Sequence, residues 1–114
     1  MVKQNAYSLD RTFAALSDPT RRALLARLEG EDGLSVSALA EPFSMSLPAV
    51  MKHLDVLGNA GLVSRTKIGR TVTCRLEAAP MQQAMAWLER YSAYWDAQLD
   101  RLAAFVEAED DDDA

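Results

Sequence analysis

The side chains of this chain that can bear chemistry are few, and the cationic ones gather in one region. Between residues 44 and 76 five basic side chains stand against one acidic one: Lys52, Arg65, Lys67, Arg70 and Arg75 against Asp55. Local charge of this kind attracts polyanions, because a charge is felt over a Debye length of about 10 Å. The net charge of the whole chain, −5, does not reveal this cationic region. Residues 107–114 alone hold six acidic side chains, and the charges of the other residues sum to +1.

The residue types of this chain do not favour catalysis or metal binding. The chain has one histidine, His53, and one cysteine, Cys74, which cannot build a four-ligand zinc site. It shows no nucleophile-and-base pair, phosphate loop or cofactor fingerprint. We therefore expect a protein that is not an enzyme and that needs neither a metal nor a cofactor.

Length and composition predict one soluble domain. The chain has 114 residues, of which 49% are apolar, and no apolar run approaches the ~20 residues that a membrane span requires. The start, "MVKQNAYSLD", lacks the apolar core of a signal peptide, and the lone cysteine suits a reducing cytosol. We expect a cytoplasmic protein with a folded domain over residues 1–107 and a disordered acidic tail over residues 108–114.

Four helices are predicted in the first half of the chain from their capping residues. Ser8, Asp18, Ser35 and Ser46 each precede a stretch with helical apolar spacing, and Gly30 ends the second helix. The third helix is short, and the fourth ends around residues 59–61. The stripes expected to face inward are Leu9, Phe13 and Leu16, then Leu24, Leu25 and Leu28, then Val36, Leu39 and Ala40, and finally Val50, Leu54 and Leu57.

The apolar period then changes from 3.6 to 2. The segments "LVSRTK" and "TVTCRL" alternate and are joined by "IGR", in which Gly69 can take a positive φ, so they predict a β-hairpin. Val72, Cys74 and Leu76 are expected to face inward, which favours a buried Cys74 over a redox thiol. From Pro80 toward Glu107 the spacing predicts one long helix with a broad apolar face.

A tight turn between two helices followed by a basic hairpin predicts a winged helix-turn-helix, in a mainly α fold. A helix fits the major groove of DNA, so the outer side chains of the fourth helix would reach base edges. The wing would contact the DNA backbone or minor groove. The predicted DNA-binding residues are Ser44, Ser46, Leu47, Pro48, Ala49, Lys52, His53, Arg65, Lys67 and Arg70.

These segments resemble the ArsR/SmtB family of bacterial winged-helix repressors. The resemblance rests on "LSDPTRRALLARL", "S-x-P-A-V-x-K-H-L" and "AGLV-x-R…GR" in fixed order, followed by the long last helix. It implies a homodimer, built mainly from the first and last helices, that represses transcription by binding a pseudo-palindromic operator in double-stranded DNA. We expect the dimer interface to include Leu9, Phe13, Met85, Leu88, Tyr91, Trp95, Leu99 and Leu102.

The chain departs from the family at its metal-binding positions. Ser35 and Ser37 stand where thiolate sensors of the family often carry a Cys-x-Cys pair, and the last helix has Asp96 and Asp100 but no histidine. Hydroxyls are poor ligands for soft metals, so metal sensing is not expected. Met51 replaces a small hydroxyl residue that is usual in the family.

Two alternatives remain beside the metal-independent repressor. The aromatic stripe near Trp87 and Tyr94 offers an apolar effector pocket at the dimer interface, which would make the protein a ligand-gated regulator. The acidic tail and Met51 would also suit a dimerisation or adaptor module that no longer binds DNA. If the tail competes with phosphates for the wing, deletion of residues 108–114 would tighten DNA binding at low salt.

Overall fold

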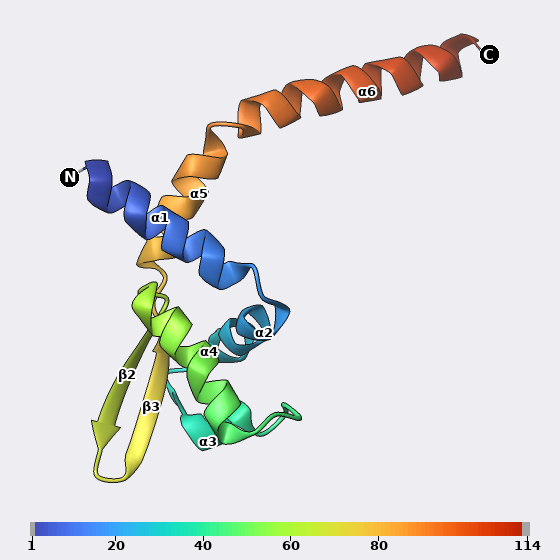
Figure 1. Ribbon diagram of the computed structural model, residues 1–114. Helices are drawn as coiled ribbons and strands as arrows, with labels where there is room; N and C mark the ends of the chain where they lie inside the picture. The colour runs from blue at the N-terminus through green and yellow to red at the C-terminus, as the bar shows by residue number, and fades with distance from the viewer. Residues whose placement is uncertain (1, 113–114) are drawn as a thin grey trace. The chain divides into compact units, whose positions relative to one another are not determined.

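The computed structural model describes the backbone of residues 2–112 and the side chains of residues 9–109. Its elements, in chain order, are α1 (Val2–Leu16), α2 (Pro19–Leu28), β1 (Leu34–Ser35), α3 (Val36–Ala40), α4 (Leu47–Asn59), β2 (Val63–Ile68), β3 (Thr71–Leu76), α5 (Ala79–Glu89) and α6 (Ser92–Asp112). The chain forms two compact units, Met1–Ala84 and Met85–Ala114. The prediction of a mainly helical chain with a small hairpin is confirmed (Figure 1).

The first unit contains a three-stranded antiparallel sheet in the order β1-β3-β2. Strands β2 and β3 form the predicted hairpin, and Gly69 at its tip has a φ of 62°. We call β2, β3 and their connection the wing. The short strand β1 was not predicted; its two residues, Leu34 and Ser35, pair with Cys74 and Thr73 and attach α3 to the sheet.

Three of the four predicted helix caps are confirmed. The side chains of Asp18, Ser35 and Ser46 accept hydrogen bonds from backbone N–H groups three residues further on, at the starts of α2, α3 and α4. Gly30 and Gly61 follow α2 and α4 with φ values of 73° and 76°, a region that side chains with a Cβ rarely enter.

The core of the first unit comes from the predicted inner stripes of α2, α3 and α4. Leu54 and Leu57 of α4 are fully buried, together with Leu24 of α2, Leu39 of α3 and Cys74 of β3. Burial of this stripe fixes which face of α4 is left for solvent.

Two predicted helix boundaries are wrong. The first helix begins at Val2, so Ser8 lies inside it; no glycine or proline interrupts residues 2–7, and the local capping preference of serine does not stop the helix there. The single helix expected after Pro80 is divided into α5 and α6. Arg90 and Tyr91 donate to carbonyls only three residues back, which tightens the backbone and ends α5.

No helix in the described part of the chain is long and apolar enough to cross a membrane. The predicted disordered tail includes residues 108–112, which continue α6, while residues 113–114 lie outside the described residues. Disorder of this segment stays a prediction.

Candidate nucleic-acid interface

Helix α4 presents its polar side to solvent because its apolar side is held in the core. The predicted contact residues at its start and first turns fall on that open side. Ser44, Ser46, Leu47, Pro48 and Lys52 are exposed, and Ala49 is half-buried. These exposed residues therefore lie on one side of the N-terminal half of α4 and just before it, as a helix that enters a groove requires.

The first turn of α4 contains one backbone N–H for which the described part of the chain supplies no partner. Pro48 has no N–H, and the N–H of Ala49 donates to Ser46 Oγ at 3.3 Å. The N–H of Leu47 is the remaining donor of this first turn, at the positive end of the helix dipole. An anionic oxygen is the partner that such a donor favours.

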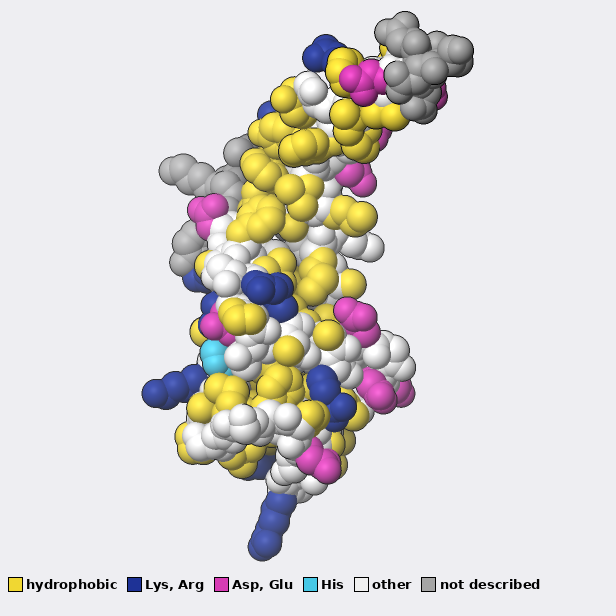
Figure 2. Space-filling view, turned by 90° about the vertical axis from the view of Figure 1, so that its right-hand side faces the viewer, with side chains coloured by type: hydrophobic (Ala, Val, Ile, Leu, Met, Phe, Trp, Pro, Cys, Tyr) yellow, Lys and Arg dark blue, Asp and Glu magenta, His cyan; other side chains and the backbone are white. Residues whose placement is uncertain are grey.

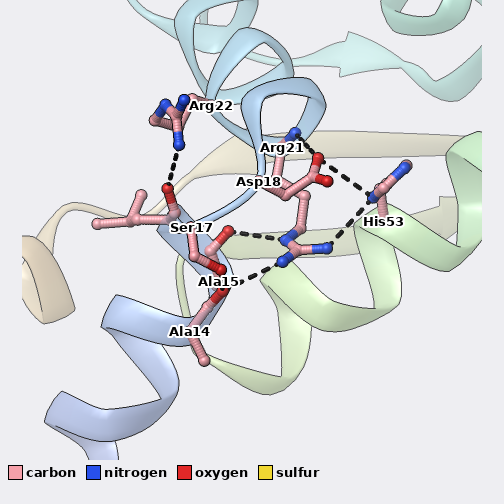
Figure 3. Close-up of polar contacts among 8 residues, drawn as sticks. Ala14, Ala15, Ser17, Asp18, Arg21, Arg22 and His53 are labelled. Atoms are coloured by element: carbon pink, nitrogen blue, oxygen red, sulfur yellow. Dashed lines mark hydrogen bonds and ion pairs between the residues drawn. The ribbon is translucent and has the colours of Figure 1, made fainter.

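His53 lies on the side of α4 that faces α2. Its side chain is 21% exposed, and its Nδ1 is 3.4 Å from Arg21 Nη1 and 3.9 Å from Asp18 Oδ2. Arg21 also donates to the carbonyls of Ala14 and Ala15, at 3.1 and 2.7 Å, and so joins the end of α1 to α4 (Figure 3). The predicted DNA contact of His53 thus competes with a role inside the domain.

The two neighbours of His53 Nδ1 differ in chemical character, since one is a donor and the other an acceptor. Arginine has only donors, so Nδ1 must be unprotonated when it accepts from Arg21. Asp18 Oδ2, 3.9 Å from Nδ1, is an acceptor and lies beyond the distance of a direct hydrogen bond. The Asp18 carboxyl has a lowered pKa, first because the Arg21 backbone N–H donates to it at 3.0 Å, and also because of the charges of Arg21 and His53.

Arg65 of the wing is paired with a carboxylate on α4. Its Nη1 lies 2.7 Å from Asp55 Oδ1, and Arg75 on the other strand donates from Nε to the carbonyl of Asp32 at 2.9 Å. Two of the five cations counted in the sequence are therefore engaged within the protein. Lys52, Lys67 and Arg70 are exposed and have no ion pair among side chains 9–109.

A hollow separates the tip of the wing from the starts of α3 and α4. Its lining consists of Ser35, Val36, Ser37, Leu47, Met51, Arg70, Thr71 and Val72. Met51 is half-buried and packs against the core. Arg70 and Leu47 bring the wing tip and the open end of α4 to one depression.

Cys74 is buried, as predicted. Burial raises the pKa of its thiol, and the opposing charge of Arg65 does not cancel this effect. The sulfur therefore stays a thiol and serves packing in the sheet. Among the described side chains no three His, Cys, Asp or Glu residues come together around a metal position.

The second unit carries a broad apolar surface. Trp95, Leu99 and Leu102 of α6 are 61%, 62% and 59% exposed. The other interface candidates of this unit are also exposed: Met85, Leu88 and Tyr91. Figure 2 shows hydrophobic side chains gathered along this C-terminal helix. In the first unit, Leu9 and Phe13 of α1 are half-buried.

Comparison with known proteins agrees with this geometry. A family model described as a helix-turn-helix domain matches residues 16–66. The chain is 35% identical over 105 residues to the HTH-type transcriptional regulator Rv2034 of Mycobacterium tuberculosis, covering 92% of this chain and 94% of that protein. It is 32% identical over 80 residues to the transcriptional repressor SdpR of Bacillus subtilis, covering 70% of this chain and 88% of that protein.

A crystal structure of an ArsR family transcriptional regulator superposes with a TM-score of 0.73 and 42% identity, covering 80% of this chain and 93% of that chain. The chain belongs to the ArsR family of transcriptional regulators. As an ArsR-family regulator with a helix-turn-helix domain for DNA binding, it is not an enzyme. The matched residues 16–66 run from the end of α1 into β2 and include the whole of α4.

Two residues at this interface were missed from the sequence. Asp55 counted only as one negative charge, although its place on α4 makes it the partner of Arg65. Arg21 appeared only as part of the motif at the start of the second helix, although it connects three helices. The alternation of side chains in β2 could have indicated the pairing of Arg65 with Asp55, because residue 65 shares a face of the strand with the buried Val63.

Proposed function

We propose that this ArsR-family regulator is a homodimeric repressor that binds a pseudo-palindromic operator and does not sense metals. Each subunit would lay α4 in a major groove and place the wing tip on the adjacent backbone. The observation that carries this proposal is the outward exposure of Lys52 on a helix whose opposite face is buried in the core. Lys67 and Arg70, exposed on the wing, extend the cationic surface.

The proposed dimer rests on the apolar surface of the second unit. Side chains such as Trp95 and Leu99 are too exposed for a helix that remains in water, and a second copy would bury them. We propose that α1, with Leu9 and Phe13, contributes to the same interface. Two α4 helices related by a two-fold axis would reach half-sites one helical turn or a multiple of it apart.

The side chains at the positions that would bind a metal do not favour metal sensing. Ser35 Oγ is already used, because it accepts from the N–H of Ala38 at 3.1 Å and caps α3. A hydroxyl committed to a cap, beside Ser37, is a weak ligand for a thiophilic metal. A regulator of this kind would act in the cytoplasm, where its operator lies.

The substitution Lys52→Ala tests the placement of α4. It should weaken binding to the operator about 5-fold to 150-fold, the ~1–3 kcal/mol that a direct contact to DNA contributes, without changing the circular dichroism spectrum. Arg101→Ala, which removes a cation from α6, is the matched control and should bind as the wild type does. Wild-type affinity in the Lys52 variant would contradict the placement.

A further inference from the structure

Arg65 differs from the other cations of the wing in where its side chain lies. Residues 63, 65 and 67 share one face of β2, and Val63 on that face is only 4% exposed. Arg65 stands opposite the buried Cys74 in the sheet, and it reaches Asp55 on α4. Its side chain is 29% exposed, so it crosses the junction between the wing and α4.

Gly58 provides a second observation on the same side chain. It lies inside α4, where glycine is an unfavourable residue. A Cβ at this position would lie 3.3 Å from Arg65 Nη2, which is tighter than most real contacts. The glycine therefore leaves room for the guanidinium, and it lies one turn after Asp55 on the same face of the helix.

The pairing changes what Arg65 can offer to DNA. An arginine uses the same N–H donors for a carboxylate and for a phosphate. Asp55 holds one of these donors, Nη1, at 2.7 Å, and this contact directs the guanidinium toward α4. The exposed Lys67, two residues further along β2, has no such partner among the described side chains.

We propose that Asp55 restrains Arg65, so that Arg65 is a positioning residue of the wing rather than a DNA contact, and that this restraint limits sequence-independent binding. The inference rests on the proposed DNA-binding function. In this proposal Lys67 and Arg70 contact the phosphates, and Asp55 contributes to specificity.

A double-mutant cycle with full-length protein tests this assignment. The proteins are the wild type, Asp55→Asn, Arg65→Gln and the double variant, with Lys67→Gln as the matched control. Fluorescence anisotropy with a random-sequence duplex gives the slope of log K against log salt concentration for each, and thermal melts confirm folding. Each phosphate contact adds about 0.9 to the slope, or roughly 3.5-fold over a fourfold change in salt.

Arg65→Gln should leave the slope unchanged, whereas Lys67→Gln should reduce it by about 0.9. Asp55→Asn should steepen the slope by about 0.9, because Arg65 is released, and the double variant should match Arg65→Gln. If Asp55→Asn acts equally with and without Arg65, or if Arg65→Gln lowers the slope, the inference is overturned while the proposed function stands. If the wild type binds no duplex, the proposed function fails and takes the inference with it.

Discussion

His53 shows how the role of one residue depends on its neighbours. The sequence offered the only histidine of the chain, in the middle of the predicted DNA-binding helix, as a base or phosphate contact. The structure surrounds its Nδ1 with Arg21 and Asp18, both near the start of α2. Lys52, the preceding residue, is exposed. Of these two neighbouring residues of α4, His53 contacts α2 and Lys52 faces outward.

Asp18 should make the stability of the fold depend on pH. Its pKa is lowered in the folded state, so its charge stabilises the fold above the ordinary aspartate pKa, and this contribution is lost as the pH falls through the folded pKa. The wild type should be more stable than Asp18→Asn at neutral pH. The two should converge in strongly acidic solution, as measured by urea unfolding at several pH values. A difference in the free energy of unfolding between the two proteins that does not change with pH would contradict this account. The asparagine of the variant retains the cap but does not titrate.

At the scale of elements, the junction between α4 and the wing depends on backbone conformation. Gly61 has a φ of 76° and lies two residues before the start of β2, while the N–H of Leu62 donates to the carbonyl of Leu57 at 2.9 Å. This closes the end of α4 and sets the direction in which the wing leaves. A residue with a Cβ would be strained at this point.

Gly61→Ala should therefore destabilise the protein by about 1–2 kcal/mol, measured as the free energy of unfolding in urea. Gly61→Asn is the matched comparison, because asparagine tolerates the left-handed region better than alanine does. If the alanine variant is as stable as the wild type, the backbone of this junction is not constrained as described.

The elements that could be predicted from sequence are those decided by local chemistry. The caps of α2 and α4 follow from Asp18 and Ser46, and the hairpin follows from alternation around Gly69. The division of the last helix had no local marker, since no glycine or proline occurs after Pro80. The Arg65–Asp55 pair connects a strand with a helix, so it depends on tertiary packing that residue spacing does not contain.

At the scale of the whole molecule, the exposed apolar face of α6 is the feature that a monomer does not explain. Each large apolar side chain buried in an interface contributes about 1.5–3 kcal/mol. Trp95, Leu99 and Leu102 lie on this face with more than half of their surface exposed. The proposed dimer would contain two DNA-binding helices, the number that an operator with two half-sites needs.

Leu99→Glu should abolish the dimer, because it places two like charges in an apolar interface. Sedimentation should then give the mass of one chain, 12.5 kDa, where the wild type gives twice that mass. Arg101→Ala on the same helix is the control and should remain dimeric. A wild-type protein that sediments as a monomer at every concentration would contradict the assembly.

The measurement that tests the central claim most directly is the binding of the wild-type protein to the DNA upstream of its own gene, across a series of salt concentrations. The account predicts a specific complex whose log affinity falls linearly with log salt, because exposed lysines and arginines displace counterions from phosphates. No binding to this or to any other duplex, even at very low ionic strength, would contradict it.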